Sequence, residues 1–270
     1  MKRRTFLSGV AAAGILACEI PAVHASDSVE LSAALFDDSR LVGLTADGDG
    51  YESAAKRLIR CHDGGLWLEA MASAEYDRPR QPGEPWPHLL VEQVWGAAGV
   101  RLVDLAKLQF GLTARVDHFV NHMSPADYDP GLQAAQVTAY FTLQNRNESS
   151  PDYGNLVWFG VPVVDDRYDI PPAHYAEDAG HTGQTNQFIA VMPGSEFWDR
   201  SIKDGRWHSI RTDLLPFLHH AFSVAQQGGY LPRTRVEELR ITTFNYGWEL
   251  PGAFDVALQV KPLTAVAVVR

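Results

Sequence analysis

Apolar and polar residues alternate along most of the chain, which is the pattern of β-strands that bury one face. Clusters of Gly, Pro, Asn and Asp separate the alternating segments, and Asp63-Gly64 between the first two favours a tight hairpin turn. Because strands follow strands with almost no helix between them, the pattern predicts an all-β, jelly-roll β-sandwich with one short α-helix. The predicted strands are residues 55–62, 65–73, 88–95, 107–120, 135–145, 155–164, 186–192, 206–211, 238–246, 253–260 and 263–269.

One segment has the periodicity of an amphipathic helix. It follows Asp213, whose carboxylate can cap a helix, and it stops before Gly228-Gly229. We expect this helix to cover an edge or the convex side of the sandwich. The Pro-rich segments 77–87 and 165–185 are expected to form long loops at the rim of a functional site. The apolar face of the helix comprises Leu214, Leu215, Leu218, Ala221, Phe222 and Ala225.

The first 25 residues have the layout of a cleaved export signal. Lys2, Arg3 and Arg4 precede an apolar run, and a small-residue cleavage site ends at Ala25. The stretch RRTFL is typical of the twin-arginine route. The apolar run of about 13 residues is too short for a membrane span, which needs about 20. We therefore predict a signal at 1–25 and one domain at 26–270, which is periplasmic or secreted.

A second interpretation of the same segment involves Cys18. The stretch Ile15-Leu16-Ala17-Cys18 resembles a lipoprotein cleavage box, so processing there would leave a lipid anchor on Cys18. Cleavage after Ala25 would instead leave Cys61 as the single thiol of the mature protein. In that case no internal disulfide is expected, and the stability must come from the core.

The charge of the chain narrows the classes of partner. The full chain carries 23 Lys and Arg against 33 Asp and Glu. The signal contains three of these cations and one of the anions, so the mature charge is −12. A surface of this sign repels nucleic acid and anionic membranes. We expect neither as a partner, and a neutral polysaccharide or oligosaccharide fits better.

Two strands carry glutamates that suit glycoside chemistry. On the segment 88–95, His88 and Glu92 share one face. Glycoside hydrolysis uses two carboxylates, one as acid and one as nucleophile or base. We therefore predict Glu249 as the proton donor and Glu92 as its partner, with His88 and Asn245 binding substrate. On the late strand, period-two alternation places on one side Ile241, Thr243, Asn245, Gly247 and Glu249.

Seven tryptophans are many for this length, and flat rings stack on the apolar faces of sugars. Trp158 and Trp248 are the two that we expect to act as sugar platforms. Strand alternation places Trp248 on the side opposite Glu249, so burial in the core is the alternative for this residue.

Metal chemistry has weak support in the sequence. His118 and His122 share a strand face, but two residues do not make a site, and no Cys/His cluster is present. We predict no resident metal or other cofactor. Calcium remains one alternative, because oxygen ligands that suit it occur at Asp165, Asp166, Asp169, Glu177 and Asp178.

Four motifs resemble one known family. WPHLL, NLVWFG, DLLPFL followed by GYL, and GWELPGAFDVALQV occur in the order seen in the small jelly-roll endoglucanases of glycoside hydrolase family 12. The resemblance implies a concanavalin-like sandwich, a groove for β-glucan, and an acid/base role for Glu249. It also implies a nucleophilic glutamate four residues before Trp158, where this chain has Gly154. Either the register of this motif differs, or Glu92, Asp165 or Asp166 replaces that carboxylate, or the retaining mechanism is lost.

The predicted function is therefore that of an exported carbohydrate-active protein, a glycoside hydrolase. The first alternative is a non-catalytic carbohydrate-binding module, whose binding would survive conversion of the carboxylates to amides. The second is a polysaccharide lyase, in which His and Tyr side chains near Arg115 or Arg167 abstract a proton next to a uronate.

Overall fold

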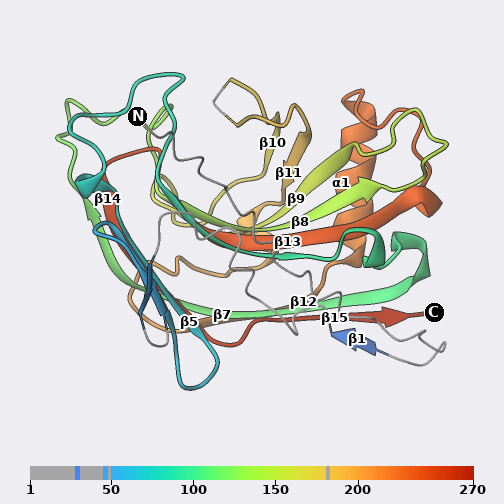
Figure 1. Ribbon diagram of the computed structural model, residues 1–270, viewed down its shortest axis with the longest axis horizontal. Coiled ribbons are helices and arrows are strands. Elements are labelled where there is room, and N and C mark those ends of the chain that lie inside the picture. Colours follow the sequence, from blue (N-terminus) through green and yellow to red (C-terminus); the bar gives the residue numbers. More distant parts are fainter. Residues whose placement is uncertain (1–27, 31–44, 48–49, 181–182) are drawn as a thin grey trace, which may run out of the picture.

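The computed structural model describes residues 28–30, 45–47, 50–180 and 183–270. The predicted signal, its cleavage site and Cys18 lie outside these ranges. Two β-sheets pack face to face around one hydrophobic core, which confirms the predicted all-β jelly-roll sandwich (Figure 1). Within the described part of the chain, no helix has the length and apolar character needed to cross a membrane.

The first sheet has nine strands. Along its main path the order is β1 (Ser28–Glu30), β15 (Thr264–Val269), β7 (Leu105–Asn121), β14 (Phe254–Val260), β5 (Leu66–Met71), β4 (Lys56–Arg60), β3 (Gly50–Glu52) and β2 (Thr45–Asp47). Its ninth strand, β12 (His208–Asp213), pairs with β7.

The second sheet has six strands. Their order is β10 (His174–Glu177), β11 (Phe188–Val191), β9 (Leu156–Asp165), β8 (Gln136–Asn145), β13 (Leu239–Glu249) and β6 (His88–Val94). In this sheet β11 runs parallel to β9, and the other pairs are antiparallel. The short 3-10 helices are η2 (Ala72–Ala74), η3 (Gly96–Ala98), η4 (Leu102–Asp104), η5 (Gly194–Glu196) and η6 (Val236–Glu238).

Every predicted strand is present, because each alternating segment buries its apolar face between the two sheets. The hairpin at Asp63-Gly64 is also confirmed. The carboxylate of Asp63 accepts the Gly65 amide at 3.0 Å, and Gly64 adopts the positive φ that favours glycine. Four strands are not in the prediction. Three of them (β1, β2 and β3) have only three residues each, and β10 lies inside the Pro-rich segment 165–185.

Within the described residues there is one α-helix, α1 (Leu215–Gln227), and it follows Asp213, as predicted. The Asp213 carboxylate accepts the backbone amides of Leu215 (3.0 Å) and Leu108 (2.9 Å), so it joins the start of the helix to β7. The helix packs against β9, β11 and β7, on the core side of the six-stranded sheet. Because the opposite face of that sheet is concave, the helix covers the convex side (Figure 1).

A β-bulge in β13 corrects one predicted facing. The pairing of β13 with β8 shifts between Ile241 and Thr243, so one extra residue is accommodated there. Ile241 therefore lies in the core with Phe244 and Trp248, not on the side of Asn245. Hydroxyl groups fill the bulge, since Thr142 on β8 hydrogen-bonds the Thr243 side chain at 2.8 Å.

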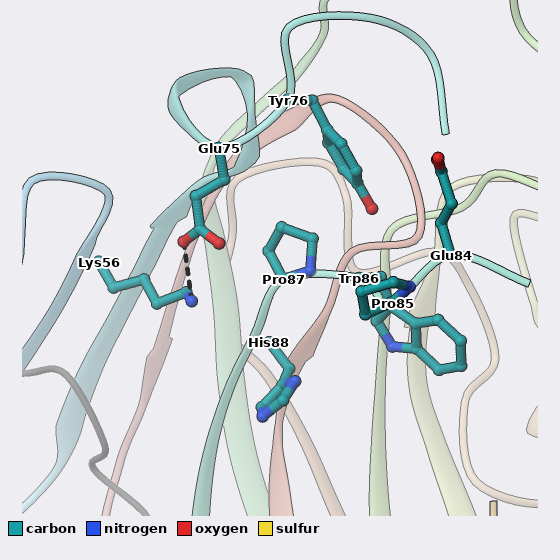
Figure 2. A pocket seen from close by; sticks show the side chains of 8 residues that line it. All are labelled: Lys56, Glu75, Tyr76, Glu84, Pro85, Trp86, Pro87 and His88. Carbon is teal, nitrogen blue, oxygen red and sulfur yellow. Dashed lines mark ion pairs between the residues drawn. The ribbon is translucent and has the colours of Figure 1, made fainter. Parts of the chain in front are cut away.

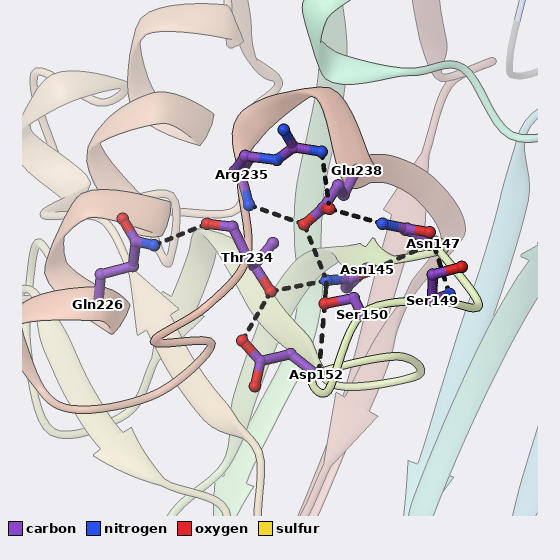
Figure 3. Close-up of polar contacts among 9 residues, drawn as sticks. All are labelled: Asn145, Asn147, Ser149, Ser150, Asp152, Gln226, Thr234, Arg235 and Glu238. Carbon is purple, nitrogen blue, oxygen red and sulfur yellow. Dashed lines mark hydrogen bonds and ion pairs between the residues drawn. The ribbon is translucent and has the colours of Figure 1, made fainter.

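A buried polar network ties three segments together at one end of the sandwich (Figure 3). The Asn145 amide at the end of β8 donates to the Thr234 hydroxyl (2.7 Å). Thr234 in turn donates to Asp152 in the β8–β9 connection (3.0 Å). The side-chain amide of Gln226, in the last turn of α1, donates a hydrogen bond to the Thr234 carbonyl (2.9 Å). Because these groups satisfy one another, the network fixes the start of β13 relative to β8 and α1.

Candidate active site

The face of the six-stranded sheet that points away from the core is concave (Figure 1). In β6, Leu89 and Val91 point into the core, so the residues between them point to the concave face. The same alternation assigns this face in the other strands. Its members are His88, Leu90, Glu92 and Val94 in β6; Thr243, Asn245, Gly247 and Glu249 in β13; Gln136, Thr138, Tyr140, Thr142 and Gln144 in β8; and Leu156, Trp158, Gly160 and Pro162 in β9.

Glu249 lies in a row of polar residues that crosses four strands. It is opposite His88 on β6 and opposite Gln136 on β8. Gln136 is in turn opposite Asp165, at the end of β9. Neighbouring strands are about 4.8 Å apart, so the Cα atoms of Glu249 and Asp165 are separated by about 10 Å. Thus two carboxylates share one row, with one strand between them.

Glu92 occupies the same face but a different row. It is opposite Asn245, and Asn245 is opposite Tyr140. Glu92 is four positions from His88, a distance of about 13 Å along the strand. Its side chain is almost fully buried, with 4% exposed. Glu92 and Glu249 therefore lie on neighbouring strands at different levels, rather than opposite one another across a groove.

The Tyr140 phenol is close to the Glu249 carboxylate. Burial raises the pKa of Tyr140, and the negative charge of Glu249 raises it further. The phenol therefore stays protonated over the physiological range and keeps its hydrogen-bond donor. Its ring contacts the Trp158 ring edge to face, with centroids 6.1 Å apart.

Arg167, which the sequence suggested only for the lyase alternative, lies at the end of this row beside Asp165. Arg167 donates to both carboxylate oxygens of Asp165, at 2.8 Å and 2.6 Å, and to the Gln136 amide oxygen at 3.4 Å. Burial first, and then the Arg167 charge, lower the pKa of nearby His174. The sequence signal for this arrangement was the Asp165-x-Arg167 spacing at a strand end, which by itself does not reveal the contact with Gln136.

The two predicted sugar platforms have different positions. Trp158 is half-buried on the concave face, and its indole donates to the Thr185 hydroxyl at 3.2 Å. Trp248 is completely buried in the core, where its indole donates to the Leu68 carbonyl of the other sheet at 3.1 Å. The expectation that Trp248 stacks on a sugar is therefore wrong. Strand alternation is the physical reason, because the residue before Glu249 must point the opposite way.

The structure also shows where the residues of the metal alternative, and Arg115 of the lyase alternative, are located. Among the described residues, no group of three or more His, Cys, Asp or Glu side chains is arranged to hold a metal ion. Of the carboxylates considered for calcium, Asp165 binds Arg167, and Asp166 accepts the Tyr128 hydroxyl at 2.5 Å. Arg115 is on the outer face of β7, paired with Asp117, so it is remote from the concave face.

Comparison with known proteins gives distant similarities only. No family model matches the chain, and no curated protein matches it. Among solved structures, a family 12 xyloglucanase from Bacillus licheniformis is 11% identical, with a TM-score of 0.48, and the match covers 89% of this chain and 100% of that one. The endoglucanase cel12A from Rhodothermus marinus is 11% identical (TM-score 0.43; 89% and 98% covered).

A family 11 xylanase from Neocallimastix patriciarum is also 11% identical, with a TM-score of 0.37, and the match covers 83% of this chain and 94% of that one. Identities and scores this low assign neither an activity nor site residues. The chain is distantly similar to the jelly-roll glycoside hydrolases of family 12, the family that its four sequence motifs resemble.

Proposed function

We propose that this protein is an exported glycoside hydrolase that binds a neutral polysaccharide or oligosaccharide across the concave face and uses Glu249 as the proton donor. One observation carries the proposal. Glu249 is half-buried on the concave face, beside the protonated Tyr140 phenol, and in the same row as a second carboxylate, Asp165. A general acid must hold a proton for the leaving oxygen, and partial burial is one way in which enzymes arrange this.

Asp165 suits the second catalytic role better than Glu92. It shares the row of Glu249, with one strand between them, whereas Glu92 lies at another level; both residues are almost fully buried, with 7% and 4% exposed. Arg167 occupies both oxygens of Asp165. The separation of about 10 Å between the Cα atoms of Glu249 and Asp165 leaves room for a water molecule, so Asp165 suits a base that accepts a proton from water. In inverting enzymes, such a base lies about 6.5–9.5 Å from the acid.

The proposed reaction is a single displacement. Glu249 gives its proton to the glycosidic oxygen while the bond from that oxygen to the anomeric carbon breaks. A water molecule attacks the anomeric carbon from the opposite side and gives its proton to Asp165. Trp158 supplies an aromatic surface for one sugar ring, and Asn245 and His88 supply hydrogen-bonding groups.

The test begins with a screen of the mature protein against neutral and acidic polysaccharides. The polysaccharide that the wild type cleaves is then tested with the variants Glu249→Gln, Asp165→Asn and Glu92→Gln. General acid catalysis contributes about 10²–10⁴-fold, so turnover by Glu249→Gln should fall by about that factor while glycan binding persists. Asp165→Asn should lose a similar factor, and Glu92→Gln much less. Wild-type turnover by Glu249→Gln, with an unchanged melting temperature, would remove this residue from the mechanism.

The non-catalytic binding module is a second candidate, and a specific observation favours it. The second carboxylate of the row, Asp165, is already neutralised by Arg167. If the protein is only a binding module, the wild type will bind a glycan in the screen without cleaving it. Glu249→Gln and Asp165→Asn will then bind that glycan with unchanged affinity.

A further inference from the structure

A cavity of about 400 Å³ opens beside β6, the edge strand of the six-stranded sheet (Figure 2). Three segments that are far apart in sequence form its walls. Lys56 comes from β4, Glu75 and Tyr76 follow η2, and the end of the 77–87 loop continues into His88. In Figure 2, the ion pair of Lys56 and Glu75 lies across the cavity from Trp86. A cavity of this size matches the lower range of small-ligand sites.

The wall that contains Trp86 is fixed by a buried arginine. The Arg80 guanidinium lies 4.8 Å from the centre of the Trp86 ring, and the Arg80 side chain is only 5% exposed. It donates to the carbonyls of Glu84 (2.9 Å) and Leu132 (3.0 Å). Arg78 pairs with the Glu84 carboxylate at 3.0 Å, and this ion pair joins two distant points of the 77–87 loop. The cavity is therefore preformed, which lowers the entropic cost of binding.

The groups around the cavity suit an uncharged ligand that is rich in hydroxyl groups. Lys56 and Glu75 neutralise each other at 2.8 Å, and Arg78 neutralises Glu84. Burial raises the pKa of Tyr76 to about 12, so its phenol keeps a proton, which it donates to the Leu250 carbonyl at 3.3 Å. The ion pair, the phenol and the imidazole of His88 offer both donors and acceptors. The remaining lining is apolar: Pro85, Trp86 and Pro87.

The cavity continues the row that contains Glu249. From Asp165 the row passes through Gln136 and Glu249 to His88, and His88 also lines the cavity. Because β6 is the edge strand, the next space along this line is the cavity itself. One strand spacing, about 4.8 Å, separates Glu249 from His88. This is close to the length of one sugar ring, so a glycan lying across the strands would reach the cavity within one or two sugar units.

We infer that this cavity binds the terminal sugar of a neutral glycan and thereby fixes which linkage lies at Glu249. The inference rests on the proposed function, because it concerns the substrate of the same site. The Lys56–Glu75 ion pair forms the wall that the chain end meets. Cleavage is then directed to chain ends, and its first products are one or two sugar units long.

The test separates binding from turnover. In the Glu249→Gln background, gluco-, xylo- and manno-oligosaccharides of three to six units are titrated by calorimetry. Trp86→Ala should weaken the tightest of these interactions by about tenfold or more, since truncation of an aromatic anchor typically removes at least that much. Tyr76→Phe removes only the hydroxyl group and should weaken it severalfold. The matched control is Trp207→Ala, which truncates a partly exposed tryptophan that packs on Arg115, away from the concave face.

With active enzyme, the product pattern gives a second measurement. The native protein should release mono- or disaccharides from the first minutes, and Trp86→Ala should release longer fragments while folding normally. Unchanged oligosaccharide affinity in both Trp86→Ala and Tyr76→Phe would overturn the inference even if hydrolysis depends on Glu249. Conversely, weakened binding in these two variants, with no hydrolysis of any glycan by the wild type, would leave the cavity assignment standing and remove the hydrolase.

Discussion

At the scale of single residues, Trp158 and Trp248 show how position determines the role of one residue type. Trp158 is on the concave face and is held by Thr185 and Tyr140. Trp248 is in the core between the sheets and has an indole hydrogen bond to Leu68. The first therefore belongs to the candidate binding surface, and the second belongs to the packing that supports it.

Alanine substitutions should separate these two roles. Trp248→Ala should lower the free energy of unfolding by about 3–5 kcal/mol, because it leaves a large cavity and removes a buried hydrogen bond. Trp158→Ala should cost no more than about 1.5 kcal/mol, mainly from its aromatic contact, but should weaken glycan binding. Denaturant unfolding and glycan titration of both variants measure this difference. Equal losses of stability would contradict the two placements.

At the scale of elements, strand identity follows from sequence alternation, whereas the site depends on contacts that alternation does not encode. The pattern was sufficient to place His88 with Glu92 and Asn245 with Glu249, because side chains alternate strictly along a strand. It failed at Ile241, since a bulge changes the alternation locally. The pairing register that puts Asp165 in the row of Glu249 depends on which strands become neighbours. The same is true of the cavity near Trp86, which three distant segments form.

The network at the end of β8 gives a prediction at this scale. The Arg235 amide, and then the Asn147 side chain, donate to Glu238 and hold the pKa of its carboxyl below the ordinary range. A lowered folded-state pKa means that the ionised group stabilises the fold above its unfolded pKa of about 4.3. That contribution is lost as the pH falls through the folded pKa. Glu238→Gln should therefore lower the melting temperature at pH 7.

The difference in melting temperature between the wild type and Glu238→Gln should shrink as the pH falls below about 4. The neighbouring exposed Glu237 supplies the matched control, since Glu237→Gln removes the same charge from η6 without touching the network. A melting-temperature difference that is independent of pH would show that Glu238 acts through shape rather than charge.

At the scale of the whole molecule, the two sheets have different roles. The nine-stranded sheet and α1 bury the convex side of the six-stranded sheet, while the concave side presents polar and aromatic groups. If the predicted signal is removed, the resulting charge of −12 suits the neutral glycan that we propose as substrate. The proposed function therefore depends on export as well as on chemistry.

Export is tested by replacing Arg3 and Arg4 with lysines. If the twin-arginine route is used, the precursor should remain in the cytoplasm, because that route requires both arginines. Fractionation and immunoblotting measure its location, and unchanged export would indicate the general secretory route. Cys18→Ala serves as the second arm. It should release a membrane-bound protein if Cys18 carries a lipid, and it should change nothing if cleavage follows Ala25.

The central position of β13 has a consequence for the synthesis of the protein. This strand lies between β8 and β6, both of which precede it by about a hundred residues or more in the chain. Until β13 has left the ribosome, β6 and β8 each have an edge without its final neighbour. Strand edges of this kind pair readily with other chains. We therefore expect chaperones to shield these edges until late in translation, and Glu249 reaches its row only when the sheet closes.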